Sequence, residues 1–232
     1  MNDKIIPYSK QYIFQKDIRI INSVLKSQFL TQGPMVPKFE NRIKKMVKSK
    51  YAISVNSATS GLHLACLSLN LSSNDILWTS PNSFVASANC GRYCNAKVDF
   101  VDIDSRTGNL DINLLEEKLF LSKKKNLLPK ILVSVHYAGQ PTIQEKIFKL
   151  SKTYGFKIIE DASHSLGASR NMVKVGNCKW SDLCVFSFHP VKSITSAEGG
   201  IITTNNQKLY EVLLLLRNSG IQRNKEKLSN KN

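Results

Sequence analysis

The sequence predicts an α/β fold with a mainly parallel, buried sheet of seven strands. From Tyr51 onward, short runs rich in β-branched and aromatic residues alternate with longer helix-like stretches, and this pattern is typical of strand–helix–strand units. Because 42% of the 232 residues are hydrophobic and 22% are charged, the chain can bury a core and should be globular. The predicted strands are YAISV (51–55), DILWT (75–79), KVDFVDI (97–103), KILVSV (130–135), FKIIE (156–160), LCVFSF (183–188) and GIITT (200–204).

Helix-like stretches separate most of the earlier strands. They are SGLHLACLSL (60–69), FVASANCGRY (84–93), INLLEEKLF (112–120) and IQEKIFKLSKTY (143–154). In the last of them Ile143, Ile147 and Leu150 fall on one stripe of a helix. Two amphipathic helices, KDIRIINSVLKSQF and VPKFENRIKKMVKSK, precede the first strand and are split by the turn signal TQGP. A final helix, QKLYEVLLLLRNSG (207–220), ends at a glycine.

The charge of the chain leaves two interpretations open. The formal net charge is +16, from 33 Lys and Arg against 17 Asp and Glu, which is compatible with a nucleic acid or another anionic partner. The lysines are nevertheless spread along the chain, often beside asparagine as in NKEKLSNKN, and no basic stripe is interleaved with aromatic residues. A compositional bias toward Lys and Asn explains the charge as well as a function does, and we expect no nucleic-acid partner.

The five cysteines and the apolar runs indicate the compartment. The number of cysteines is odd and no pair has C-x-x-C spacing; they are Cys66, Cys90, Cys94, Cys178 and Cys184. We expect reduced, mostly buried thiols and no metal site. No apolar run approaches the roughly 18 residues of a membrane-spanning helix, and MNDKIIPYSK has no apolar signal core. These patterns predict a cytoplasmic protein without a membrane partner.

The first stretch that can carry chemistry is VNSATSG, from Val55 to Gly61. A predicted strand ends here and a helix begins, across small hydroxyl residues. Free backbone N–H groups at a helix N-terminus suit a phosphate group. The alternative is a simple helix cap by Ser57 or Thr59. There is no G-x-G-x-x-G and no G-x-x-x-x-G-K-[ST], so neither a dinucleotide fingerprint nor a P-loop is indicated.

The second stretch is FKIIEDASHSLGA, residues 156–168. It follows a buried strand with Glu160 and Asp161, and His164 comes shortly after. Carboxylates at the carboxyl end of a parallel strand point into the ligand crevice of such a sheet. An acid there can hold a metal, a ribose or a protonated ring nitrogen. The alternatives are a carboxylate that caps the next helix and a structural histidine.

The third stretch is FSFHPVKSITSAEGG, residues 186–200. Lys192 lies in the loop after a predicted strand and is followed by Gly199 and Gly200. A lysine becomes a nucleophile when its amine is deprotonated; the alternative is a solvated loop lysine. A phosphate seat, a strand-end acid and a loop lysine together are the groups that pyridoxal 5'-phosphate (PLP) requires. The two glycines would leave room for close backbone packing beside it.

The motifs together resemble the DegT/DnrJ/EryC1/StrS family of PLP-dependent sugar aminotransferases. They are FLTQGP, VNSATSGLHLA, WTSPNSFVASANC, KVDFVDID, VHYAGQP, IIEDASHSLGA and FSFHPVKSITSAEGG, in family order between about residue 7 and residue 220. The segments NSFVASANCGRYC and VHYAGQP are most similar to those of the branch that aminates UDP-4-keto-6-deoxy-N-acetylhexosamine on the way to pseudaminic acid. The resemblance implies the type I fold of PLP-dependent transferases, here its large domain.

The resemblance also implies the roles of the residues that act on the amino group. Lys192 would hold the cofactor covalently and shuttle the proton during transamination. Asp161 would pair with the pyridinium nitrogen, and His164 would lie near the phenolic oxygen. A dehydrating branch of the family has histidine where the lysine stands, so that Lys192 favours transamination.

The same resemblance implies how the cofactor is seated. Thr59, Ser60 and Ser187 would bind its phosphate, and Phe84 would stack on its pyridine ring. Glutamate would give its amine to the cofactor, and a keto-deoxy nucleotide sugar would then take it, in surface polysaccharide or nonulosonic acid synthesis.

The family pattern also sets expectations for domains and partners. We expect residues 1–220 to form the PLP-binding large domain with an N-terminal helical segment, and residues 221–232 to form a disordered basic tail. We expect the C-terminal small domain of the family to be missing. The implied partner is a second copy in a homodimer, or a full-length paralogue. A cofactor-binding partner subunit without full activity is the alternative function, and a nucleic-acid-binding protein is suggested by charge alone.

Overall fold

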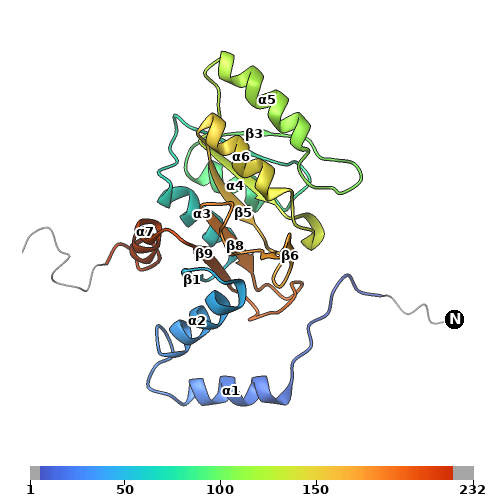
Figure 1. Ribbon diagram of the computed structural model, residues 1–232. Coiled ribbons are helices and arrows are strands. Elements are labelled where there is room, and N and C mark those ends of the chain that lie inside the picture. The colour runs from blue at the N-terminus through green and yellow to red at the C-terminus, as the bar shows by residue number, and fades with distance from the viewer. Residues whose placement is uncertain (1–5, 222–232) are drawn as a thin grey trace, which may run out of the picture.

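A computed structural model describes residues 6–221. Its main sheet has seven strands in the order β1-β9-β8-β5-β4-β2-β3 (Figure 1). All seven predicted strands are confirmed, as β1 (Tyr51–Val55), β2 (Ile76–Thr79), β3 (Lys97–Phe100), β4 (Ile131–Val135), β5 (Lys157–Asp161), β8 (Leu183–Ser187) and β9 (Gly200–Thr204). Only β9 runs against its neighbours, pairing antiparallel with both β1 and β8, so the sheet is mainly parallel as expected.

Each predicted helix is present, and the bounds shift by a few residues. The helices are α1 (Gln15–Leu25), α2 (Met35–Val47), α3 (Ala58–Ser68), α4 (Ala86–Tyr93), α5 (Ile112–Lys124), α6 (Gln144–Tyr154) and α7 (Gln207–Arg217). A 3-10 turn, η1 (Tyr137–Gly139), follows β4. None of the described helices is long and apolar enough to cross a membrane. The predicted tail 221–232, apart from Ile221, lies outside the described residues.

A short hairpin was not predicted. It consists of β6 (Ser169–Arg170) and β7 (Val173–Lys174), which pair antiparallel. Its two turn residues, Asn171 and Met172, both have positive φ angles of 48° and 61°, the backbone of a tight hairpin turn. Two-residue strands are too short for a period-2 pattern, and methionine is not a turn signal, so the sequence gives no indication of this hairpin.

The sheet is buried on both faces by helices. On one face Val185 and Ile202 pack with residues of α3, α4 and α7. On the other face Phe186 and Ile201 pack against α2, while α5 and α6 cover the strands farther along the sheet, as Figure 1 shows. Because helices cover both faces of the sheet, the side chains on both faces of its central strands are buried, and these strands are continuous apolar runs in the sequence. This three-layer arrangement leaves the carboxyl ends of the parallel strands free to form a site.

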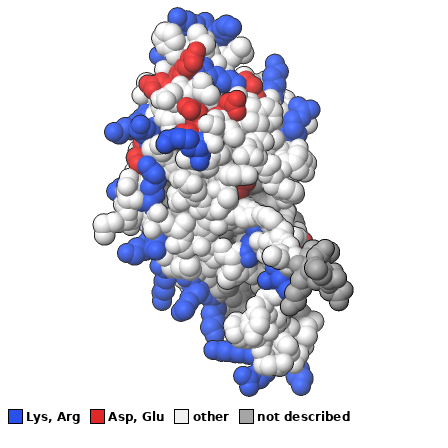
Figure 2. All heavy atoms as spheres, turned by 90° about the vertical axis from the view of Figure 1, so that its right-hand side faces the viewer, with Lys and Arg blue, Asp and Glu red and all other residues white. Residues whose placement is uncertain are grey.

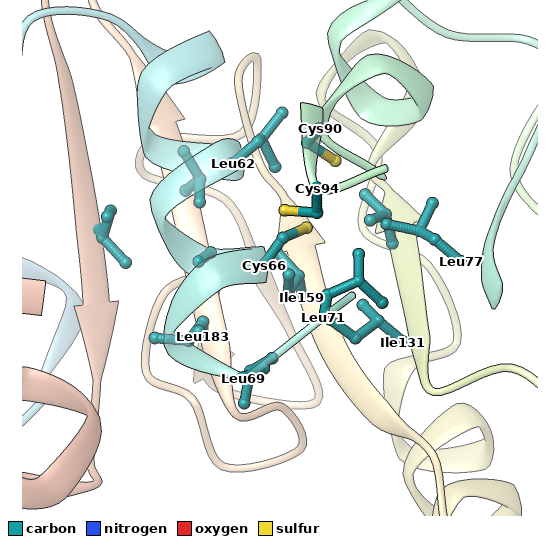
Figure 3. Close-up of a cluster of buried hydrophobic side chains, with 14 of the residues drawn as sticks. Leu62, Cys66, Leu69, Leu71, Leu77, Cys90, Cys94, Ile131, Ile159 and Leu183 are labelled. Carbon is teal, nitrogen blue, oxygen red and sulfur yellow. The ribbon is translucent and has the colours of Figure 1, made fainter. Parts of the chain in front are cut away.

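Three of the five cysteines lie in the core between α3 and α4. Figure 3 shows Cys66, Cys90 and Cys94 with their sulfur atoms among leucine and isoleucine side chains. All five cysteines are free and buried, in line with the expectation that the thiols are mostly buried. Burial raises the pKa of the Cys178 thiol to about 12, so this thiol is poorly nucleophilic at neutral pH.

Candidate functional site

A cavity of about 650 Å³ opens at the carboxyl ends of β4, β5 and β8. Parallel strands bring their carboxyl ends to one edge, where α/β proteins bind ligands. The N-terminus of α3 lies at the same edge because β1, which precedes it, also ends there. Six of the seven sequence-predicted site residues line the cavity: Thr59, Phe84, Asp161, His164, Ser187 and Lys192. The seventh, Ser60, is not among the lining residues.

Asp161 is the last residue of β5 and is buried. Its Oδ2 accepts a hydrogen bond of 2.6 Å from the Ser87 hydroxyl of α4. Its Oδ1 accepts from the Ser163 hydroxyl at 2.6 Å and from the Ser163 backbone N–H at 3.2 Å. These donors stabilise a buried carboxylate and fix its orientation. Ser87 was not predicted as a site residue, because a serine in a helix gives no signal for a partner 74 residues away in the sequence.

Lys192 and His164 meet in the cavity. The Lys192 Nζ atom lies 2.7 Å from His164 Nε2. Burial lowers the pKa of the Lys192 amine, and the charge of Asp161 works against this shift. Burial is also the main reason why the pKa of His164 is lowered, and the Lys192 charge adds to it. Both shifts favour the neutral forms, which are the forms that attack a carbonyl group and accept a proton.

The N-terminus of α3 is capped by Ser57, as one of the two interpretations of VNSATSG predicted. The Ser57 Oγ accepts from the Ser60 backbone N–H at 3.1 Å and lies 3.0 Å from the Ser60 Oγ. The hydroxyl of Ser60 is therefore directed to the cap, whereas Thr59 faces the cavity. A cap and a phosphate seat are compatible here, because a capped helix still presents its first turn to an anion.

The predicted close packing at the glycine pair is present at Gly200. A Cβ atom there would lie 2.6 Å from the Ser57 carbonyl carbon and 2.7 Å from the Ala58 nitrogen. Only glycine lets β9 approach the start of α3 this closely. A Cβ atom at Gly199 would instead meet the flexible Ser196 side chain, so the backbone constraint applies to Gly200.

Ser187 and Phe84 complete the predicted set from two other segments. Ser187 ends β8 and is 9% exposed, and its Oγ accepts a long bond of 3.4 Å from the His189 N–H. Phe84 lies just before α4 and is 72% exposed. An aromatic ring so exposed at a cavity wall offers a flat apolar surface to a ring-shaped ligand.

The expectation that both carboxylates of the IIEDASH motif face the crevice is wrong for Glu160. Asp161 lines the cavity, whereas Glu160 does not and bonds instead to His136 and Ser181. Successive side chains of a strand point to opposite faces, so adjacent residues of β5 cannot both face the cavity.

Several lining residues were not predicted at all. They come from loops and turns and include Tyr8, Asn82, His136, Tyr137, His189 and Glu198. The VHYAGQP motif marks two of them, but no role follows from its letters alone. The others lie in loops, where no periodic pattern reveals which way a side chain points.

Basic side chains do not gather in one stripe on the face of the molecule that Figure 2 shows. They are spread from one end of that face to the other, with acidic side chains mainly in its upper half. This distribution agrees with the spread of lysines along the sequence and gives no sign of a nucleic-acid groove on that face.

Comparisons with known proteins point to one family. Residues 11–232 match the family model described as the DegT/DnrJ/EryC1/StrS aminotransferase family. A Campylobacter jejuni UDP-4-amino-4,6-dideoxy-N-acetyl-beta-L-altrosamine transaminase is 41% identical over 94% of this chain and 56% of its own length. A Shewanella sediminis UDP-4-amino-4-deoxy-L-arabinose–oxoglutarate aminotransferase is 32% identical over 95% of this chain and 55% of its own.

Solved structures of sugar aminotransferases are similar to this chain as well. Helicobacter pylori PseC, an aminotransferase involved in the biosynthesis of pseudoaminic acid, superimposes with a TM-score of 0.86 at 36% identity, over 95% of this chain and 58% of PseC. The PLP form of a Streptococcus pneumoniae sugar aminotransferase gives a TM-score of 0.80 at 25% identity, over 91% of this chain and 57% of the other. The chain thus has the type I fold and spans little more than half the length of these relatives. It belongs to the DegT/DnrJ/EryC1/StrS aminotransferase family.

Proposed function

We propose that this chain is the cofactor-binding part of a PLP-dependent transaminase that moves an amino group from glutamate to a keto-deoxy nucleotide sugar. The observation that carries the proposal is the contact between Lys192 and His164 in a cavity that a buried carboxylate, Asp161, also lines. An amine with a lowered pKa, a proton acceptor and a fixed anion are the groups that this chemistry requires.

The residues present fit PLP. The start of α3, with Thr59, and the end of β8, with Ser187, offer N–H and hydroxyl groups to a phosphate. Asp161 can accept from a protonated ring nitrogen, and Phe84 offers an aromatic surface. When bound, PLP acts as an electron sink for the carbon that carries the amino group.

The proton transfers fall to the residues of the chain itself. Lys192 in its neutral form takes a proton from a substrate carbon, and His164 at 2.7 Å accepts from or donates to Nζ. Asp161, held by Ser87 and Ser163, keeps its charge directed into the cavity.

The substrate assignment is supported by the relatives. Two curated relatives are named as transaminases of UDP-linked amino sugars, and PseC is described as acting in the biosynthesis of pseudoaminic acid. We therefore propose a nucleotide-sugar substrate, glutamate as amino donor, a cytoplasmic location, and action as a homodimer or with a longer paralogue.

A cofactor titration tests the proposal. The full chain is mixed with PLP, and its visible absorption band is recorded before and after glutamate is added. We expect a protein-bound band that shifts with glutamate, and we expect Lys192→Ala to abolish it. Lys157→Ala is the matched control, since Lys157 lies at the surface against Asp182.

Two results separate the alternatives. A band that does not respond to glutamate favours a cofactor-binding partner subunit without the full activity. The absence of any band that depends on Lys192 would contradict both of the functions that involve the cofactor.

A further inference from the structure

We propose that Glu160 and His136 form a buried positioning pair that fixes one wall of the cavity. In this role Glu160 acts through His136 on the turn at residues 137–139, and the turn acts on His164. The proposal rests on the proposed function for its effect on cofactor binding, but the pair itself is defined by the unliganded chain.

The pair begins with the alternation of β5. Glu160 and Asp161 are adjacent, and both are buried. Asp161 is directed into the cavity, whereas the Glu160 Oε2 lies 2.8 Å from His136 Nε2. The Ser181 hydroxyl donates to the other oxygen of Glu160. A buried carboxylate without hydrogen-bond donors destabilises the fold. The bonds from His136 and Ser181 therefore stabilise Glu160 at its buried position.

The hydrogen bonds fix the tautomer of His136. Its Nδ1 accepts the backbone N–H of Thr142 at 3.1 Å, and a backbone amide can only donate. Nδ1 therefore carries no hydrogen, and the single hydrogen of a neutral ring is on Nε2. Nε2 donates to Glu160, which accepts on both oxygens as a carboxylate. His136 is thus a neutral ring of known orientation, although it lines the cavity.

A ring with both nitrogens engaged is not available for proton transfer. His136 is 2% exposed, and neither nitrogen is left to bond with a substrate. By contrast, His164 Nε2 faces the Lys192 amine. Of the histidines that line the cavity, His164 and His136 therefore have different tasks: His164 handles protons, and His136 holds structure.

The structure that His136 holds is the turn η1. Ala138 has a left-handed backbone with φ of 50°, and Gly139 has φ of 90°. A Cβ atom at Gly139 would lie 2.8 Å from the His164 carbonyl oxygen, so the turn packs directly on the backbone of His164. Residues in this region of φ persist only where their surroundings hold them.

Both ends of the turn are tied down. His136 precedes it, and Thr142, whose N–H bonds to His136, follows it. At the first residue of the turn, the Tyr137 N–H donates to Asn109 Oδ1 at 2.8 Å. Loss of the carboxylate of Glu160 would leave the Nε2–H of His136 buried without an acceptor, and the ring, the turn and the His164 backbone would all be free to shift.

Histidine NMR of the unliganded chain tests the pair without the cofactor. The chain has only four histidines, so nitrogen-15 labelling gives four rings, and His136→Asn assigns the signal. We expect the nitrogen signals of His136 to be those of the Nε2–H tautomer that the hydrogen bonds indicate. A proton on Nδ1 of this ring would overturn the proposal.

Substitution of Glu160 tests the positioning. In Glu160→Ala we expect the ring signals of His164 to move in the unliganded chain and the affinity for PLP to fall about tenfold. Glu160→Gln, which keeps an acceptor oxygen, should restore most of both. The control is Glu145→Ala, which removes a carboxylate on α6 that is paired with Arg170 and should change neither.

Failure of this proposal and failure of the proposed function are distinguishable. If the unsubstituted chain does not bind PLP, the proposed function fails, while the tautomer of His136 and the His164 signals still decide the pair. If Glu160→Ala shows no cooperative thermal transition, His136→Asn, which removes the other member of the pair, replaces it, and the ring signals of His164 should move in that variant. A Glu160→Ala chain with unchanged His164 signals and unchanged PLP affinity contradicts the positioning role.

Discussion

Lys192 is the residue on which the proposed chemistry depends. Its burial lowers the stability of the fold while the amine is charged, and this effect changes with pH. Its pKa is lowered by burial, so between that lowered pKa and the ordinary lysine value of about 10.4 the unfolded chain binds more protons at this site. Stability from this group therefore rises with pH through that window. Residues that sit unfavourably in a fold are common at active sites.

We expect Lys192→Met to be more stable than the unsubstituted chain at neutral pH. The advantage should shrink as the pH rises toward about 10.4, because the cost of the buried ammonium disappears there. Urea unfolding of both proteins at a series of pH values measures the difference. A difference in the free energy of unfolding that stays constant or widens with pH would contradict the lowered pKa.

Ser87 tests whether the orientation of Asp161 matters. Ser87→Ala removes the donor to Oδ2, and we expect PLP to bind about tenfold more weakly because a buried acceptor loses its partner. Ser68→Ala is the matched control: Ser68 is also buried and donates to the Ala65 carbonyl. It should lower stability by about 1 kcal/mol and leave PLP affinity unchanged. Equal affinities of the two variants for PLP would argue against a role for Ser87.

At the scale of elements, the sequence predicts most of what the structure contains. Strands such as β4 and β8 are continuous apolar runs, and their burial on both faces explains why they are easy to recognise. The reversed direction of β9 is different, because strand direction depends on the connections before and after the strand and not on its own residues. The same limit applies to the site: Lys192 and Asp161 stand out by residue type near the ends of predicted strands. Ser87 and His136 gain their roles through contacts that only the folded chain creates.

The packing of β9 on α3 gives a prediction at this scale. Gly200→Ala would place a Cβ atom 2.6 Å from backbone of Ser57, so the strand or the helix must move. We expect a loss of about 1–3 kcal/mol in the free energy of unfolding, as for overpacked cores, together with weaker PLP binding.

Gly155→Ala provides the comparison. Gly155 has a positive φ of 84°, and no atom lies within 4 Å of the place that a Cβ atom would take. Its substitution should therefore cost about 1–2 kcal/mol from backbone strain alone without changing PLP affinity. Thermal unfolding and cofactor titration of both variants separate the two effects. Unchanged PLP binding in a folded Gly200→Ala chain would show that this close approach does not shape the site.

At the scale of the whole molecule, α1 stands apart from the core. None of its residues is buried, and Phe14, Ile18, Ile21 and Leu25 lie on one helical stripe with exposures of 42–63%. An exposed apolar stripe of this kind favours association.

We therefore expect the purified chain to self-associate through α1. The double substitution Ile21→Gln and Leu25→Gln should lower the average mass in sedimentation experiments, because it removes apolar area while keeping helix propensity. Asn22→Gln, on the same helix, should leave the mass unchanged. If the double substitution has no effect on the mass, association does not use this stripe.

The position at which PLP attaches decides whether Lys192 is the reactive amine of this cavity. The full chain is incubated with PLP, reduced with borohydride and digested, and the modified peptide is identified by mass spectrometry. We predict that the added pyridoxyl mass lies on Lys192 and that His164→Ala lowers its yield. A mass distributed over surface lysines, with Lys192 unmodified, would contradict the assignment of this cavity as a PLP site.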